Sequence, residues 1–272
     1  MTTTPVKYIS IHGLPRSGTS WLGQIFNSSP AVAYRFQPLF SYAFKSRLSA
    51  TSSAEEIHKF FSDINNTNDD FVLQKYNVSG TKNPEFSKVL PSTHIVMKEV
   101  RYHYVVGNLI RKVPEIKIVG LVRNPCAVIN SWFQAPKEFK PEWNKLEEWR
   151  SARHKNMNKP EEYYGFEKWK EVANLFISLS EKYPSNIIIV NYEDLNTVTE
   201  QAVKDIFDFC ELKVEKQTAD FIIQSRNTHS DDPYDIMRHK KLNDVWKNEL
   251  DKTIINEIYS ELTGTNLEQF LK

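Results

Sequence analysis

Short apolar runs recur along the chain and are rich in β-branched residues. Each ends in polar or turn-forming residues and is too short for a buried helix, which predicts a strand. Because the runs show no polar face, both sides of each strand are expected to be covered. The predicted strands span residues 6–13, 94–99, 116–123 and 186–192.

Between these runs, apolar residues return every three or four positions, the period of an amphipathic helix. After the first strand this period covers Trp21 to Phe26, and Pro30 ends the helix. Three further segments with the same period are predicted helices, at residues 163–183, 199–210 and about 248–262.

Buried strands that alternate with helices predict an α/β fold, in which a central parallel sheet is flanked by helices. The 272 residues suit one large domain, so we expect a single domain over residues 1–272. Two polar segments, at about 40–70 and 134–162, are predicted to be helical insertions or lids. Ligands of such folds bind at the carboxyl ends of the strands.

The charge and composition of the chain limit the classes of partner that we expect it to bind. There are 35 basic and 34 acidic residues, so no overall field attracts nucleic acid or an anionic membrane, and local groups must hold any anion. Cys126 and Cys210 form neither a disulfide framework nor a metal-ligand pattern. We see no signal peptide and no apolar run near the roughly 18 residues of a membrane span, and therefore expect a cytoplasmic protein.

The sequence GLPRSGTSWL begins at Gly13, at the end of the first predicted strand, and leads into a predicted helix. Gly13 and Gly18 have the spacing of a phosphate-binding P-loop, whose backbone N–H groups surround an anion. A triphosphate-binding loop would carry lysine at position 19, where this chain has Thr19. Arg16 supplies a cation from within the loop instead, which indicates a smaller anion bound without metal.

A second anion-binding pattern follows the third predicted strand, which ends at Arg123. Asn124 can cap the next helix and Pro125 suits its first turn. Ser131 lies eight residues after Arg123, in the second turn, so both side chains can reach one anion. The alternative is a surface arginine followed by a helical serine without a function.

The first motif resembles the 5′-phosphosulfate loop of sulfotransferases that use 3′-phosphoadenosine 5′-phosphosulfate (PAPS). Its Pro-Arg-Ser-Gly-Thr form resembles the tyrosylprotein, carbohydrate and bacterial branches of that family, whereas the cytosolic branch usually has lysine at the position of Arg16. The resemblance implies that this P-loop domain binds PAPS without a metal. It assigns the 5′ end of the cofactor to Arg16, Ser17, Gly18, Thr19, Ser20 and Trp21.

The second motif resembles the 3′-phosphate site of the same family, which implies that Arg123 and Ser131 hold that phosphate. NYEDL, at residues 191–195, resembles a family segment that places Tyr192 near the nucleotide. IMRHKKLNDVWKNEL, at residues 236–250, resembles a segment whose arginine, here Arg238, is a second 3′-phosphate ligand. Its register departs by one residue, so Lys240 or Lys241 could take that role. For Tyr192 and Trp246, plain core packing is the alternative.

Sulfuryl transfer requires stabilisation of the charge that develops on the leaving oxygen. Arg16 is expected beside that oxygen. MKEVR, at residues 97–101, resembles the Lys-x-x-Arg segment of carbohydrate sulfotransferases, which implies that Lys98 is a second electrostatic catalyst. A solvated lysine after a strand is the alternative.

A hydroxyl acceptor also needs a general base. In related enzymes a catalytic glutamate follows the P-loop, but VAYRFQPLF has Gln37 at that position, and an amide cannot accept the proton. Gln37 is therefore expected to position the acceptor. Glu99 and His103 are the candidate bases, and Glu85 is a further alternative.

The resemblance implies a sulfotransferase that moves the sulfuryl group of PAPS to a hydroxyl or an amine or amide nitrogen and releases 3′,5′-ADP. We expect a small-molecule or glycan acceptor, with the tailoring of a natural product as one setting, and no nucleic-acid or membrane partner. Three alternatives stay open: a non-catalytic relative that binds the nucleotide, a P-loop kinase that uses ATP and Mg²⁺, and a structural α/β domain.

Overall fold

The structure is a computed structural model that describes residues 5–75, 83–228 and 244–272. At its centre is a five-stranded sheet with the order β2-β3-β1-β4-β5, and every neighbouring pair is parallel. The strands are β1 (Lys7–His12), β2 (Val32–Phe36), β3 (His94–Glu99), β4 (Lys117–Val122) and β5 (Ile187–Asn191). The predicted fold class, a parallel sheet flanked by helices, is confirmed.

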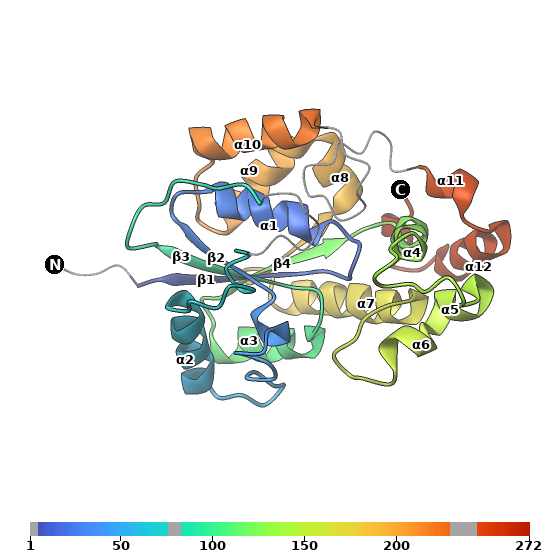
Figure 1. Cartoon of the computed structure of the whole chain (residues 1–272), viewed down its shortest axis with the longest axis horizontal. Helices are drawn as coiled ribbons and strands as arrows, with labels where there is room; N and C mark the ends of the chain where they lie inside the picture. The colour runs from blue at the N-terminus through green and yellow to red at the C-terminus, as the bar shows by residue number, and fades with distance from the viewer. Residues whose placement is uncertain (1–4, 76–82, 229–243) are drawn as a thin grey trace.

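Helices cover both faces of the sheet (Figure 1). On one face lie α1 with α8, α9 and α10, and on the other lie α2, α3 and α7. The helices are α1 (Thr19–Ser28), α2 (Ala54–Asn65), α3 (Val106–Lys112), α4 (Pro125–Phe133), α5 (Lys145–Ser151), α6 (Arg153–Asn156), α7 (Phe166–Lys182), α8 (Tyr192–Thr197), α9 (Thr199–Phe209), α10 (Lys216–Asn227), α11 (Trp246–Glu249) and α12 (Lys252–Leu262), with short 3₁₀ turns at Pro38–Phe40, His103–Val105 and Glu268–Phe270.

The alternation of side chains along each strand divides the core into two clusters. In β1, Ile9 and Ile11 pack in the cluster that contains the apolar residues of α1 and α9. In β3, Ile95 and Met97 face the opposite cluster, which contains the apolar side chains of α2, α3 and α7. Successive residues of a strand point to opposite faces. Each strand therefore carries apolar side chains on both faces, as a sheet between two helical layers requires.

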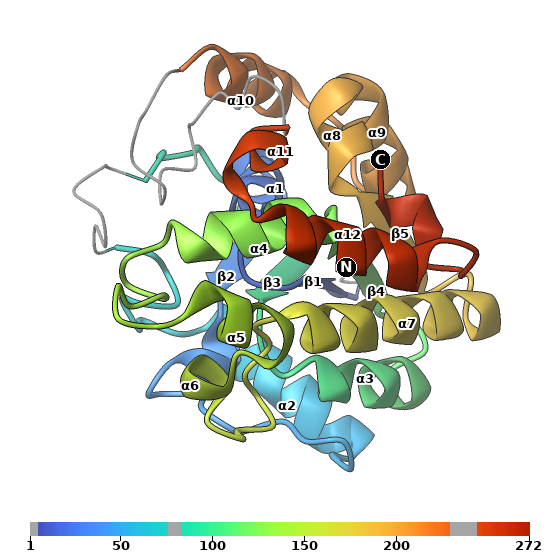
Figure 2. The same ribbon diagram turned by 90° about the vertical axis from the view of Figure 1, so that its right-hand side faces the viewer.

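The carboxyl ends of the strands converge on one end of the sheet. In the ladder between β1 and β3, His12 pairs with Glu99, so the residues that follow β1 emerge beside the end of β3. His12 also pairs with Gly120 of β4, two residues before that strand ends. Figure 2 is turned so that this end faces the viewer, and α4, α11 and α12 lie in front of the sheet there.

All four predicted strands are present, within one or two residues of their predicted ends. The structure adds β2, which the sequence reading missed, and it ends β5 at Asn191, so that Tyr192 begins helix α8 instead of ending a strand. The segment 134–162 contains α5 and α6, and the segment 40–70 contains α2. Each segment therefore contains helix, and its role as an insertion or lid stays a prediction.

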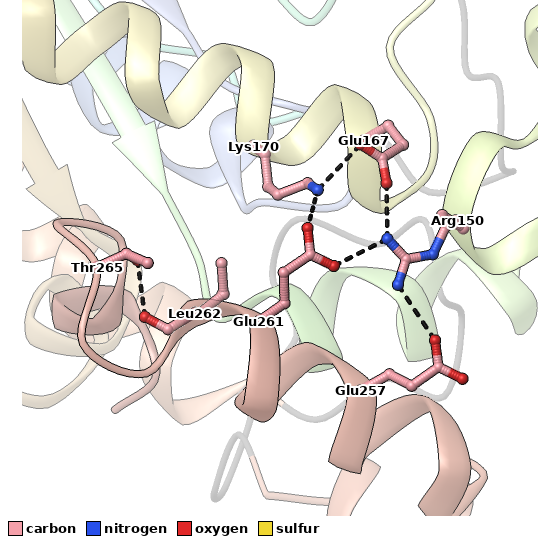
Figure 3. A network of polar contacts seen from close by, with 7 residues as sticks. All are labelled: Arg150, Glu167, Lys170, Glu257, Glu261, Leu262 and Thr265. Carbon is pink, nitrogen blue, oxygen red and sulfur yellow. Dashed lines mark hydrogen bonds and ion pairs between the residues drawn. The ribbon is translucent and has the colours of Figure 1, made fainter.

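A network of ion pairs ties three helices together at the surface (Figure 3). The guanidinium group of Arg150 in α5 contacts Glu167 of α7 and Glu257 and Glu261 of α12. Lys170 of α7 contacts both Glu167 and Glu261. The Arg150 side chain is 37% exposed, so solvent screens these pairs, and we assign the network to holding α5 against α7 and α12.

In the described part of the chain, no helix is both long and apolar enough to cross a membrane. Cys126 and Cys210 are both buried free thiols.

Candidate active site

The loop from Gly13 to Gly18 joins β1 to α1 and depends on glycine at two points. A Cβ atom on Gly13 would lie 2.6 Å from the carbonyl oxygen of Leu121 in β4. Gly18 has a φ of 90°, and a Cβ there would lie 2.4 Å from the ring of Tyr192. The two glycines therefore let the loop pass close to β4 and to α8.

This loop leaves hydrogen-bonding groups available at the start of α1. The first N–H groups of a helix have no acceptor within the helix, and Gly18 at the N-cap offers no side chain to satisfy them. The Ser17 side chain is completely buried, yet its hydroxyl has no partner among the described residues. The helix dipole also favours an anion at this end. Backbone donors and the hydroxyl of Ser17 therefore lie in the loop where the sequence predicts an anion.

The Gly18→Ala variant is expected to unfold at lower urea concentration than the Gly264→Ala variant. Both glycines have positive φ, which costs alanine about 1–3 kcal/mol. Nothing lies within 4 Å of the Cβ position at Gly264, whereas at Gly18 the ring of Tyr192 must also move. Equal losses of unfolding free energy in the two variants would refute the contact between the loop and Tyr192.

The two predicted anion motifs meet in the structure. Arg16 Nε donates a hydrogen bond to Ser131 Oγ at 3.2 Å, although the residues are 115 positions apart. Arg123 donates from its terminal nitrogen to the carbonyl oxygen of Arg16 at 2.9 Å. The loop after β1 and the helix after β4 therefore form one contiguous site, not two distant pockets.

Arg123 is held firmly between the sheet and α8. Its side chain is 5% exposed, and its guanidinium carbon lies 4.7 Å from the centre of the Tyr192 ring. Burial lowers the pKa of Arg123, while Tyr192 and Glu193 act in the opposite direction. Trp169 Nε1 donates to the Arg123 carbonyl oxygen at 2.9 Å. Tyr192 is 4% exposed and thus serves packing as well as stacking on the guanidinium.

The predicted helix start after Arg123 is present as α4. Asn124 caps it, with its side-chain oxygen accepting from the N–H of Cys126 at 2.9 Å, and Pro125 occupies the first turn. This cap fixes where Ser131 emerges from the helix.

Trp21, in the first turn of α1, donates from Nε1 to Ser225 Oγ of α10 at 3.0 Å. That bond attaches α10 to the helix that follows the loop.

The Lys98 side chain extends from the end of β3 to the start of α1. Its amine donates to Ser20 Oγ at 3.3 Å and sits 4.6 Å from the centre of the Phe36 ring. The side chain is 2% exposed. Burial lowers the pKa of Lys98 to about 7, with Arg101 acting in the same direction and Glu99 and Glu138 opposing it. Lys98 is therefore not the solvated lysine of the alternative reading.

Glu99 points to the opposite face of the sheet from Lys98. One carboxylate oxygen accepts from the N–H of Leu39 at 2.8 Å, and the other is buried without a partner among the described residues. Burial raises the pKa of Glu99 to about 8. Its side chain has no exposed surface. Proton transfer from an acceptor to Glu99 would require the residues around it to move.

His103 is also completely buried. Its Nδ1 lies 3.1 Å from Nδ1 of His12, and His12 Nε2 lies 2.8 Å from Ser10 Oγ. The His103 ring packs edge-on against Tyr163 at 4.5 Å between centroids. Burial lowers the pKa of His103 well below its ordinary value. His103 therefore belongs to a buried polar chain beneath the loop, and His12 is a member that the sequence did not reveal.

Acid is expected to destabilise the protein through this histidine pair. Burial lowers the pKa of His12 to about 3, against about 6.5 in the unfolded chain. Below pH 6.5 the unfolded chain binds a proton that the folded protein cannot bind, so stability falls as pH falls toward 3. The free energy of unfolding should fall by up to about 1.4 kcal/mol for each pH unit below about 6.5, until the pH reaches about 3. Urea unfolding at pH 7 and pH 5 measures it.

The control for this prediction is the exposed His58. His12→Asn should weaken the dependence of unfolding free energy on pH, whereas His58→Gln should leave it unchanged. An identical pH dependence for wild type and His12→Asn would contradict the assignment.

Gln37 lies at the end of β2 in a left-handed backbone conformation, with a φ of 41°. Its side-chain oxygen accepts from Arg101 at 3.3 Å, and Arg101 also pairs with Glu162 at 3.1 Å. The Arg101 guanidinium lies over the Phe40 ring at 4.2 Å. Arg101 thus links the two inserted segments. The sequence contained a signal for it, because it lies three residues after Lys98.

Several predicted residues lie elsewhere. Arg238, Lys240 and Lys241 fall outside the described residues. Glu85 is exposed, and Trp246 is buried against α12, with its ring 6.4 Å from that of Tyr259. Across residues 5–75, 83–228 and 244–272, no group of three or more histidine, cysteine, aspartate and glutamate side chains could hold a metal ion.

Comparison with known proteins gives one family and a set of similar folds. The family described as "Sulfotransferase domain" matches residues 7–270. Mouse sulfotransferase SULT7A1 complexed with PAP shares 14% identity at a TM-score of 0.59, with 97% of this chain and 87% of that chain covered. The sulfotransferase domain of the Synechococcus PCC 7002 olefin synthase shares 16% at 0.51, with 96% and 97% covered.

A sulfotransferase from Alicyclobacillus acidocaldarius shares 13% identity at a TM-score of 0.50, with 99% of this chain and 100% of that chain covered. At such identities the likeness to solved structures shows the fold alone. No curated protein matches the sequence.

Proposed function

Because the chain belongs to the sulfotransferase domain family, it is a sulfotransferase, and we propose that PAPS is its sulfuryl donor and 3′,5′-ADP its product. One observation carries the proposal. The loop that suits a 5′-phosphosulfate and the motif that suits a 3′-phosphate contact each other through Arg16 and Ser131. PAPS carries phosphate groups at the 3′ and 5′ positions of one ribose. Its binding site therefore needs two anion-binding groups that lie close together. The PAP bound by mouse SULT7A1 supports this choice.

The residues present fit that nucleotide. The buried hydroxyl of Ser17, which lacks a partner among the described residues, and the uncapped start of α1 would receive the 5′ group together with Thr19 and Ser20. Arg123 and Ser131 would hold the 3′-phosphate, since a guanidinium group binds a phosphate through two parallel hydrogen bonds. Tyr192 would keep Arg123 oriented. Gly18 would let the backbone approach closely.

The donor, when bound, supplies the sulfuryl group, and this chain supplies charge and orientation. Arg16 and Lys98 would both face the bridging oxygen, where negative charge develops as the bond to sulfur breaks. Lys98 has a lowered pKa of about 7, and the nearby anion would favour its protonated form. Ser20, which accepts from Lys98, fixes the direction of the amine. The roles that we assign to these residues involve no metal ion.

The acceptor is proposed to be a small molecule or glycan with a hydroxyl or an amine or amide nitrogen. The segments 40–70 and 134–162 would form its binding surface within a single catalytic domain, since Arg101 lies over the Phe40 ring of the first segment and pairs with Glu162 of the second. Gln37 is proposed to orient the acceptor through its amide, whose oxygen is already held by Arg101. Tailoring of a natural product is a setting consistent with this geometry.

A thermal-shift comparison tests the nucleotide. A ligand that binds only the folded state raises its melting temperature. 3′,5′-ADP is expected to stabilise the protein, whereas ATP with Mg²⁺ at the same concentration is not, because that loop lacks the lysine of a triphosphate site. Stabilisation by ATP with Mg²⁺ alone would favour a kinase. Binding of 3′,5′-ADP without turnover of PAPS toward any acceptor or water would indicate a non-catalytic relative.

A further inference from the structure

Helix α4, which carries Ser131, is held from outside by a single carboxylate. Glu249, the last residue of α11, accepts hydrogen bonds from two side-chain amides. Asn130 Nδ2 donates to Glu249 Oε2 at 2.8 Å, and Gln134 Nε2, from the residue that follows α4, donates to the same oxygen. The Gln134 N–H also donates to the Asn130 carbonyl oxygen at 3.3 Å, so the two residues lie one helical turn apart. Glu249 therefore holds the last turn of α4.

Ser131 lies within the turn that Glu249 holds. It follows Asn130 directly, and its Oγ accepts a hydrogen bond from Arg16 Nε at 3.2 Å. Successive residues of a helix point about 100° apart, so a rotation of this turn redirects the Ser131 hydroxyl. The cap at Asn124 fixes the first turn of α4. The bonds to Glu249 fix the other end, and the two together define the direction of the hydroxyl.

The backbone of Glu249 is fixed independently of these bonds. Trp246 and Leu250, on either side of it, are buried in the same core cluster as Ile129 and Trp132 of α4. Helix α11 lies against α4 (Figure 2). Glu249 itself is exposed. Its replacement therefore removes no core contact, and a variant at this position should keep the fold.

A carboxylate is an unfavourable group so close to a proposed phosphate site. Glu249 is bonded to the residue next to Ser131, and a negative charge there repels a phosphate. Its charge and its hydrogen bonds therefore have opposite effects on the binding of an anion. Removal of the charge alone would strengthen binding, whereas release of α4 would weaken it. The sign of the effect distinguishes the two roles.

We infer that Glu249 is a positioning residue of the nucleotide site, which holds α4 so that the Ser131 hydroxyl points at the 3′-phosphate. Glu249 would contact neither the nucleotide nor the acceptor, and it acts through Asn130 and Gln134. The inference rests on the proposed function, because it takes Ser131 as a ligand of that phosphate.

A double-mutant cycle tests this role, since two residues that act through one another have effects that do not add. Affinity for 3′,5′-ADP is measured by calorimetric titration in the full-length wild type, in Glu249→Ala, in Ser131→Ala and in the double variant. Glu249→Gln keeps an oxygen that can accept from the amides but loses the charge. Glu257→Ala is the matched control, because Glu257 is an exposed glutamate of α12 that pairs with Arg150. The melting temperature of each variant is measured in parallel.

Glu249→Ala is expected to weaken binding of 3′,5′-ADP about 10-fold, the lower end of the loss known for residues that orient a metal ligand. Ser131→Ala should weaken it by at least as much, since a hydrogen bond to a charged group is lost. In the Ser131→Ala background, Glu249→Ala should have no further effect. Glu249→Gln should lie between wild type and Glu249→Ala. Glu257→Ala should bind as the wild type does, even where its melting temperature is lower.

Equal losses from Glu249→Ala with and without Ser131→Ala overturn the inference, because Glu249 would then act on the fold as a whole. Unchanged or tighter binding by Glu249→Ala overturns it too, since the carboxylate would then contribute nothing or only its charge. Normal binding by Ser131→Ala removes the ligand through which Glu249 is inferred to act, and has the same consequence. If Glu249→Ala does not fold, the cycle is run with Glu249→Gln, in which a smaller and equally non-additive loss is expected.

The same measurements separate this inference from the proposed function. If the wild type fails to bind 3′,5′-ADP, the proposed function itself is wrong. If Ser131→Ala weakens binding and Glu249→Ala does not, the role of Glu249 alone is wrong.

Discussion

Arg123→Met is expected to weaken binding of 3′,5′-ADP by between about 30-fold and a few thousand-fold. Removing one member of a buried, hydrogen-bonded charge pair costs about 2–5 kcal/mol, and each 1.4 kcal/mol is about tenfold in affinity. Arg123 is 5% exposed, so water cannot replace its guanidinium group at the proposed 3′-phosphate. Isothermal titration calorimetry of wild type and variant measures the effect.

Two further variants separate the loss of a ligand contact from a loss of folding. Arg123→Lys keeps the charge but lacks the planar pair of donors, so its affinity should lie between wild type and Arg123→Met. Arg111→Met removes an exposed arginine of α3 and should bind normally. The melting temperature of each variant is measured as well. Arg123 also donates a hydrogen bond to the carbonyl oxygen of Arg16, so its replacement also removes a contact within the folded protein. Unchanged affinity in a folded Arg123→Met protein would disprove the 3′-phosphate assignment.

Lys98→Met is expected to slow sulfuryl transfer about 100- to 1,000-fold at saturating donor, the range found when one preorganised donor to a developing charge is removed. Binding of 3′,5′-ADP should change much less, since Lys98 is proposed to act where charge develops during transfer. Folding should be retained, because methionine has a similar length and keeps the contact with the Phe36 ring. Single-turnover release of 3′,5′-ADP measures the rate.

Lys112→Met is the control for this experiment, since Lys112 is an exposed lysine at the end of α3. It should have the rate of the wild type. If Lys98→Met loses affinity for 3′,5′-ADP while its rate at saturating donor stays that of the wild type, Lys98 holds the nucleotide equally before and during transfer. A rate and an affinity both equal to those of the wild type would remove Lys98 from the site altogether.

The strands and the loop motifs could be predicted from the sequence because each is specified by residues that lie close together in the chain. β3 has the predicted bounds of residues 94–99, since a run of apolar and β-branched residues bounded by polar ones is a complete description of a buried strand. The start of α4 was also predicted, because Asn124 followed by Pro125 encodes its own cap. Membership of the sulfotransferase family followed from two such motifs and is confirmed.

β2 was missed because an arginine, the fourth of its five residues, looks wrong for a buried strand. Arg35 is 9% exposed, and its guanidinium group donates to the carbonyl oxygens of Ile64 and Asn65 at the end of α2. A cation can be buried there only because the last carbonyl groups of that helix accept its hydrogen bonds. No feature near Arg35 in the sequence indicates that α2 ends beside it.

The candidate base shows the same limit. Glu99 and His103 were chosen because they follow Lys98 closely in sequence, yet neighbouring residues of a strand face opposite sides of the sheet. Lys98 faces Ser20 and Glu99 faces Leu39.

The sequence by itself determined which segments are strands and helices, where the anion-binding loop lies, and which cations follow which strand. Those properties depend on residues within a few positions of one another. Only the tertiary structure decided that Arg16 reaches Ser131, that the Tyr192 ring lies against Gly18, and that Lys98 reaches Ser20. These depend on the strand order β2-β3-β1-β4-β5, which places the ends of β1, β3 and β4 side by side. Burial, which shifts the proton affinity of Lys98, likewise exists only once the layers have packed.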